Sequence, residues 1–157
     1  MPSHEKVKSE RQYPSFPRVG IGALIFKDNR ILLIKRGQEP SKGKWTVPGG
    51  LVELGERLSE TVQREIYEEC NIRIRVLDRL GIFEFIETDQ QKDVRFHYIV
   101  IDYLADYVAG ELKAGSDIDE ARWVELDKTD ELDITDSIKP LIQKAIAIRQ
   151  GQSVPRK

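Results

Sequence analysis

Glutamates gather in the middle of the chain, directly after a glycine-rich bend. Glu65, Glu68 and Glu69 fall in a helix-like segment, and Glu56 precedes them in a loop. Residues at spacings of i, i+3 and i+4 share one helix face, where like charges repel one another. Hard oxygen donors in such a cluster suit Mg2+ or Mn2+, which often bind through a few carboxylates and substrate phosphates. The competing interpretation is a solvated, charged helix face.

The same segment has the apolar spacing of a helix with one buried side. Its apolar positions recur every four residues: Leu58, Val62, Ile66 and Cys70. The glutamates fall largely off this stripe, so the helix would have a buried side and an acidic side. The turn Pro48-Gly49-Gly50 would arrive beside the acidic side, and Ser59 is a candidate N-cap. On the stripe, Cys70 is expected to be a packed thiol rather than a nucleophile.

The order of these residues resembles the signature box of the Nudix hydrolases. Gly50 is followed by five residues and Glu56, then by seven residues and the run from Arg64 to Ile72, REIYEECNI. The family usually has glycine where this chain has Asn71. Asparagine is the next-best residue for a left-handed backbone conformation, so the helix end and the ligands are unaffected. A match at this many spaced positions is highly specific.

The resemblance implies an α/β/α sandwich with a mixed sheet, and it implies a metal site. Glu68 and Glu69 would be the core ligands of Mg2+ or Mn2+, with Glu65 beside them. A backbone carbonyl of the glycine turn, at Gly49 or Gly50, would complete the site and would lie against the substrate.

Further roles are carried over from related enzymes. Arg64 would hold Glu65 and the loop in place through an ion pair, and Glu56 would be an accessory ligand or a base. Arg36 follows a strand and would clamp the substrate's phosphates, unless it is simply a surface charge. For the carboxylate that positions or deprotonates the attacking water, Glu120 is the first candidate and Asp117 the second. A charged turn is the alternative for both.

The activity that the resemblance implies is hydrolysis of a nucleoside diphosphate linked to another group, X. ADP-ribose is the first expected substrate, nucleoside triphosphates are the second and dinucleoside polyphosphates the third. A non-catalytic Nudix domain that senses a nucleotide or sugar is the alternative. Release of AMP or phosphate in the presence of metal discriminates between the two.

Composition limits the remaining classes of function. The 157 residues predict one domain with a formal net charge of -2, which argues against a general nucleic-acid binder. No apolar run is long enough to cross a membrane. A single cysteine and the lack of a hydrophobic signal segment favour a reducing cytoplasm. A homodimer is left open.

The rest of the chain predicts the elements that surround the box. Residues 1–17 are expected to be a flexible lead or an arm for a partner subunit, 18–149 the domain, and 150–157 a disordered tail. Strands are expected at 19–26 and 31–34, as a hairpin at the sheet edge, and at 73–76, 80–86, 95–104 and 121–124. A last helix runs to about 149. Phe85, Tyr98 and Tyr103 include candidates for a base-stacking platform, with core packing as the alternative.

Overall fold

The computed structural model describes residues 11–151, so most of the predicted lead and tail, residues 1–10 and 152–157, lie outside the described residues. The strands are β1 (Arg18–Lys27), β2 (Arg30–Arg36), β3 (Trp45–Thr46), β4 (Gly49–Leu51), β5 (Arg73–Thr88), β6 (Val94–Ala109) and β7 (Ile118–Glu125). The helices are α2 (Leu58–Cys70), the 3-10 helix η1 (Leu126–Glu131) and α3 (Ile138–Arg149).

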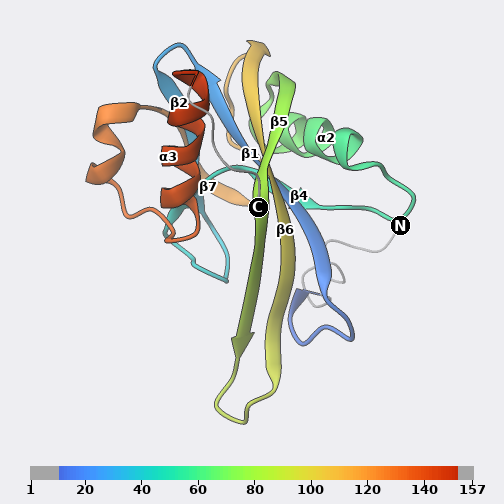
Figure 1. Ribbon diagram of the computed structural model, residues 1–157. Coiled ribbons are helices and arrows are strands. Elements are labelled where there is room, and N and C mark those ends of the chain that lie inside the picture. The colour runs from blue at the N-terminus through green and yellow to red at the C-terminus, as the bar shows by residue number, and fades with distance from the viewer. Residues whose placement is uncertain (1–10, 152–157) are drawn as a thin grey trace.

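The strands form one mixed sheet, in which β1 occupies an internal position (Figure 1). β1 forms the expected hairpin with β2, with Phe26 opposite Ile31. Along its other side β1 pairs in parallel with β6, and it also pairs with β4. The prediction of a hairpin at the sheet edge was therefore wrong. The run of apolar residues in β1 reflects burial on both faces of the sheet, which is typical of a parallel strand.

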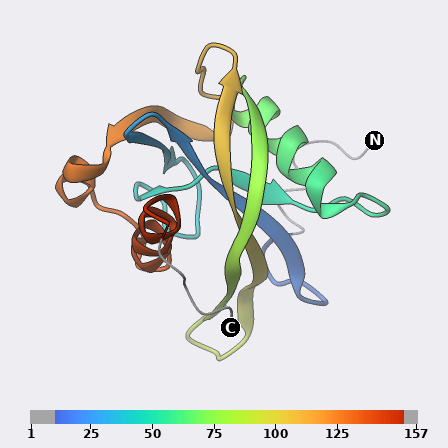
Figure 2. The ribbon, with the colours of Figure 1, turned by 45° about the horizontal axis from the view of Figure 1, so that its top comes forward.

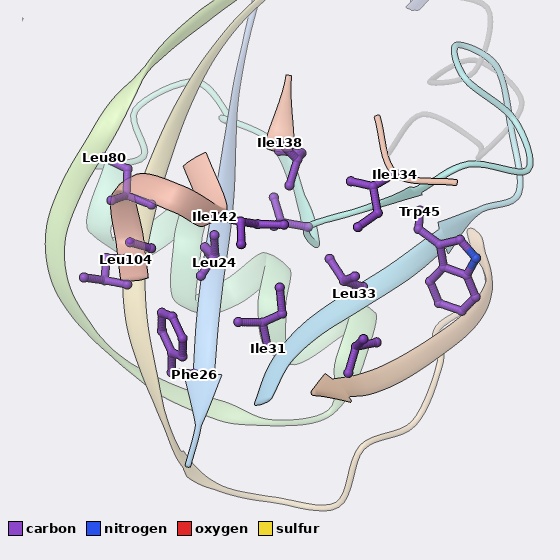
Figure 3. Packing of buried hydrophobic residues seen from close by; sticks show 13 residues of the cluster. Leu24, Phe26, Ile31, Leu33, Trp45, Leu80, Leu104, Ile134, Ile138 and Ile142 are labelled. Carbon is purple, nitrogen blue, oxygen red and sulfur yellow. The ribbon is translucent and has the colours of Figure 1, made fainter. Parts of the chain in front are cut away.

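Two apolar layers hold the helices against opposite faces of the sheet, which confirms the α/β/α sandwich (Figure 2). On one face α2 packs through Val62, Ile66 and Cys70, all fully buried. On the other face α3 packs through Ile138 and Ile142 against Leu24 and Leu33 (Figure 3). No helix among residues 11–151 is long and apolar enough to span a membrane.

The strands β5 and β6 form a long antiparallel hairpin that extends past both helices (Figure 1). The predicted strands at 73–76 and 80–86 are parts of the single strand β5, whose pairing shifts between Val76 and Asp78 and again between Arg79 and Gly81. The described part of the lead contacts this hairpin, because the Tyr13 amide donates to the Arg95 carbonyl at 2.8 Å.

Candidate active site

The helix α2 begins and ends with backbone contacts that fix its position. It begins after Arg57, whose amide donates to the Glu60 carboxylate at 3.2 Å. The predicted N-cap Ser59 instead lies inside the first turn, so that prediction was wrong. The helix ends at Asn71, which has the left-handed conformation expected of it, with φ of 61°. The Asn71 side-chain amide donates to the Glu111 carbonyl at 2.8 Å and ties the next loop to the helix end.

The buried side of α2 is the predicted apolar stripe. Leu58 at the start is partly buried, and the later three positions are fully buried. Burial raises the pKa of the Cys70 thiol to about 12, so the thiol stays protonated near neutral pH. The prediction that Cys70 is a packed core residue is confirmed.

The glycine bend lies directly beside the acidic side of α2. A Cβ at Gly50 would lie 2.2 Å from Oε2 of Glu65, and a Cβ at Gly49 would lie 2.0 Å from the Ile21 carbonyl oxygen. Only glycine therefore allows the bend to approach both β1 and the helix this closely. The Gly49 amide donates to Oε2 of Glu69 at 3.1 Å, which fixes that carboxylate against the bend.

Glu69 is a carboxylate in a site that disfavours its charge. Its burial raises its pKa to about 7, and the nearby charge of Glu65 adds to the rise. The Gly49 amide and the Arg36 guanidinium act in the opposite direction. The pKa of Glu65 is also raised, again chiefly by burial. Both groups would be stabilised in their ionised form by an added cation.

Arg64 connects the acidic residues with one another. Its Nε donates to Oε2 of Glu56 at 2.6 Å, and its Nη1 donates to Glu65 at 2.9 Å and to Glu68 at 3.1 Å. A further bond from Nη2 reaches the Leu51 carbonyl at 3.2 Å, so the predicted link between helix and loop is present. The bonds from Arg64 lower the pKa of Glu56 to about 2.

The sequence analysis missed one polar contact in this group. Thr61 is fully buried, and its hydroxyl donates to Oε1 of Glu56 at 2.6 Å. The signal was present in the sequence, since a threonine next to Val62 interrupts the apolar side of the helix. Thr61 and Arg64 together fix the Glu56 carboxylate in the loop before α2.

The carboxylates on the acidic side fit a hard divalent cation. No group of three or more His, Cys, Asp or Glu side chains within residues 11–151 is already arranged around a metal position. Arg64 takes one oxygen each of Glu65 and Glu68, however, which leaves a second oxygen on both. Glu68 is 57% exposed and can reorient at small cost, and the Glu65 carboxylate lies directly against the glycine bend because Gly50 has no Cβ. These oxygen donors are those that Mg2+ and Mn2+ prefer.

Arg36 lies on the same side of the sheet as Glu69. Burial lowers the pKa of its guanidinium, and the charge of Glu69 partly offsets this effect. Its Nε donates to the Pro40 carbonyl at 2.6 Å, which orients the side chain. The structure therefore brings the predicted phosphate clamp close to the predicted metal ligands.

The two candidates for the water-positioning carboxylate are on different sides of the molecule. Glu120 faces the α3 side, because its strand neighbours Ala121 and Trp123 pack on the α2 side, and its carboxylate pairs with Arg122 at 2.6 Å. Asp117 lies in the loop before β7, and its charge raises the pKa of Glu69. Of the two candidates, Asp117 therefore lies closer to the predicted metal ligands.

The loop that carries Asp117 is attached to the end of α2. The amide of Gly115 donates to the Glu69 carbonyl at 2.7 Å, and the amide of Lys113 donates to the Cys70 carbonyl at 3.0 Å. These two bonds use carbonyls that a helix end leaves without an intrahelical partner. The loop and the acidic side of α2 therefore form one unit.

The three aromatic residues predicted as candidates for base stacking lie on two different faces of the sheet. Phe85 and Tyr98 are directly opposite each other in the β5–β6 pair and share one face of the sheet. Tyr103 lies on the other face and packs with the α2-side cluster. Only Phe85 and Tyr98 are therefore placed to act together.

Comparison with known proteins agrees with this geometry. The NUDIX domain model matches residues 16–145. An ADP-ribose pyrophosphatase of Methanocaldococcus jannaschii is 42% identical over 116 residues, which cover 74% of this chain and 66% of that protein. An NAD-capped RNA hydrolase NudC of Photorhabdus laumondii is 38% identical over 105 residues, which cover 66% of this chain and 37% of that protein. The chain thus spans no more than two thirds of the length of either relative.

A solved structure gives the same result at the level of the fold. The MutT NUDIX hydrolase from Burkholderia pseudomallei superposes with a TM-score of 0.69 at 32% sequence identity. The match covers 83% of this chain and 98% of that one. With the family model covering most of the chain, and with the acidic helix and glycine bend placed together, this chain belongs to the Nudix family.

Proposed function

We propose that this chain is a divalent-metal-dependent hydrolase that cleaves the pyrophosphate linkage of a nucleoside diphosphate linked to X. The observation that carries the proposal is the pair of partly buried carboxylates, Glu65 and Glu69, which face the glycine bend and carry raised pKa values. Strongly perturbed carboxylates gathered beside a loop are typical of functional sites. Membership of the Nudix family supports a phosphoanhydride as the substrate.

In this proposal Glu65, Glu68 and Glu69 hold Mg2+ or Mn2+ together with a backbone carbonyl of Gly49 or Gly50. The bound ion supplies positive charge to the phosphate oxygens and lowers the pKa of water. The chain's own residues do the positioning. The Gly49 amide orients Glu69, at 3.1 Å.

The remaining charged residues act around that centre. Arg64 fixes Glu56 and aligns the carboxylates through its bonds. Arg36 contributes a partly buried guanidinium that binds the phosphates of the substrate. Asp117 is the favoured base for the attacking water because its charge is close enough to affect Glu69, whereas Glu120 is paired with Arg122 on the α3 side.

ADP-ribose remains the first proposed substrate, and nucleoside triphosphates are the second. The 42% identity with a protein that is named an ADP-ribose pyrophosphatase supports this order. The proposal further includes action in the cytoplasm. It also includes assembly as a homodimer, which a sizing measurement would test.

The test is product release from a panel of ADP-ribose, nucleoside triphosphates and dinucleoside polyphosphates. Each substrate is incubated with Mg2+, with Mn2+ and with EDTA, and the products are separated by chromatography. We expect AMP and ribose 5-phosphate from ADP-ribose with either metal and none with EDTA. Saturable binding without release from any substrate would overturn the proposal and favour a non-catalytic sensor.

A further inference from the structure

Asp102 is a nearly buried residue whose carboxylate has no hydrogen-bond or ion-pair partner among residues 11–151. It lies in the middle of β6 and is only 3% exposed. Within residues 11–151, its carboxylate makes no hydrogen bond and no ion pair, and burial alone raises its pKa to about 7. Arg11 Nε is the one described side-chain atom that is both fully buried and without a hydrogen bond, so the Asp102 oxygens keep a small contact with solvent through which a ligand could reach them. Neither the fold nor the metal site described above uses this group.

The neighbouring strands leave space for this carboxylate. Gly22 of β1 is paired with Asp102 on one side, and Gly81 of β5 is paired with it on the other. A Cβ at Gly22 would lie 2.3 Å from Oδ1 of Asp102. At Gly81 the nearest atom to an added Cβ is a Leu141 methyl carbon at 3.9 Å, so no side chain covers the carboxylate from that strand.

Aromatic rings continue the same face of the sheet toward the hairpin end. Phe83 is opposite Val100, and Phe85 is opposite Tyr98, so these side chains share the face of Asp102. The two phenylalanine rings are 6.4 Å apart and partly buried. The helix α3 packs on this face around Leu104, and the hairpin extends beyond it (Figure 1). Along β6, Asp102 is only about 7 Å from Val100.

This face is suited to a nucleobase rather than to a phosphate. Flat, partly exposed rings stack on bases, whereas a carboxylate repels a phosphate and accepts hydrogen bonds from N–H groups. The distance to the metal site is also suitable. Gly22 pairs with Asp102 on one side and with Gly49 on the other. Asp102 is thus two strand spacings, about 10 Å, from the glycine bend.

We propose that Asp102 is a specificity-determining residue that accepts a hydrogen bond from an N–H group on the edge of the substrate's base, while the base stacks on Phe83 and Phe85. The inference rests on the proposed function, since it assigns the nucleoside end of the same substrate. It places the base over β5 and β6, which flank β1 on one edge, and the pyrophosphate at the bend that leads into β4, which flanks β1 on the other edge. A ribose hydroxyl is the competing donor, and the test separates the two.

The test compares two ligands in EDTA by calorimetry. Purine riboside 5'-monophosphate lacks the amino group of AMP and is otherwise the same. We expect the wild type to bind AMP about tenfold more tightly than purine riboside 5'-monophosphate. Asp102→Val should abolish that difference, because it removes the acceptor, and Asp102→Asn should keep part of it. In steady-state assays Asp102→Val should raise KM for ADP-ribose about tenfold and leave kcat within about twofold, the result of losing one hydrogen bond to a charged group.

Asp106→Val is the matched control, since it makes the same change on the same strand. The Asp106 carboxylate pairs with Arg75 at 3.3 Å and with Arg149 at 3.5 Å, at the other end of the sheet. The Asp106→Val variant should prefer AMP over purine riboside 5'-monophosphate to the same extent as the wild type. Thermal unfolding gives a second readout, because removing an unpartnered buried carboxylate should leave the unfolding temperature unchanged or raise it.

Retention of the wild-type preference in folded Asp102→Val would overturn the inference. So would a loss of affinity that is confined to 2'-deoxy-AMP, because it would identify the ribose as the donor, and so would a large fall in the unfolding temperature of Asp102→Asn. Failure of the proposed function is distinguishable from these outcomes. A wild type that binds AMP with the Asp102-dependent preference but hydrolyses nothing would overturn the activity and support the base contact.

Discussion

Glu56 and Glu69 carry the same side chain at the two ends of one site, and their surroundings shift their pKa values in opposite directions. Glu56, in the loop before α2, accepts bonds from Arg64 and Thr61, and its pKa falls to about 2. Glu69, in the last turn of α2, is partly buried against the glycine bend, and its pKa rises to about 7. Glu56 therefore forms an ion pair with Arg64, whereas within residues 11–151 Glu69 forms no ion pair and Arg36 offsets its burial only in part.

This difference separates the residues that position the site from those that bind the ligand. At the Glu56 end, a complete set of hydrogen bonds makes the carboxylate a fixed anchor for Arg64. At the Glu69 end, a divalent cation would favour the ionised carboxylate and release a proton as it binds. The comparison predicts that changes at the Glu69 end affect activity most and that changes at the Glu56 end act through position.

The largest expected effect is that of Glu69→Gln. The variant should fold and should hydrolyse the substrate at least about a hundredfold more slowly, because it lacks a charged group that acts on the reacting phosphates. The measurement is kcat with Mg2+, together with thermal unfolding to show that the variant is folded. Glu60→Gln is the control on the same helix, since glutamine still accepts the capping bond from the Arg57 amide. Near-normal turnover in folded Glu69→Gln would contradict the proposed mechanism.

A smaller loss is expected for Arg64→Lys. Lysine keeps the charge but cannot reproduce the planar set of bonds to Glu56, Glu65 and the Leu51 carbonyl. We expect activity to fall about tenfold, the scale of a positioning defect rather than of a lost ligand. Raising the Mg2+ concentration should restore part of it, because the carboxylates remain. A loss as large as that of Glu69→Gln would show that Arg64 contacts the reacting groups themselves.

The smallest expected effect is on stability against pH, and here the two ends should differ in sign. The pKa of Glu69 is raised, so its contribution to the free energy of unfolding is fully present below about pH 4.5 and is lost as pH rises toward 7. The pKa of Glu56 is lowered, so its contribution is present above about pH 4.5 and is lost as pH falls toward 2.

Urea unfolding of metal-free protein between pH 2 and pH 8 measures both contributions. Glu69→Gln should flatten the curve of stability against pH on the neutral side, and Glu56→Gln should flatten it on the acid side. If both substitutions flattened the same side of the curve, the two carboxylates would not have opposite environments.

Local sequence was enough to predict the centre of the site. The four-residue spacing of Leu58, Val62, Ile66 and Cys70 identified the buried side of α2, and the glutamates followed on the other side. The spacing of the box likewise placed the glycine bend beside them. These features depend on neighbours within about two helical turns, and a periodic pattern specifies such neighbours.

Prediction was weaker wherever the answer depended on which strand lies beside which. The internal position of β1 follows from its parallel pairing with β6, more than seventy residues away in the chain. The face of the sheet to which a side chain points was equally hard to predict from the sequence. The pairing of β2 with β7 shifts by one residue after Lys35, where Arg36 is opposite Ile118 rather than Asp119. A shift of one residue sends side chains to the opposite face, which sequence alone does not show.

The sequence by itself determined that this chain carries an acidic helix beside a glycine bend, because both features depend on short-range spacing. Only the tertiary structure decided that Asp117 rather than Glu120 lies near Glu69, and that Asp102 is nearly buried between two glycines. The physical reason is that the burial of a side chain, and the face of the sheet on which it lies, are properties of the assembled sheet. A carboxylate acquires its environment, and with it its charge state, only when distant strands meet around it.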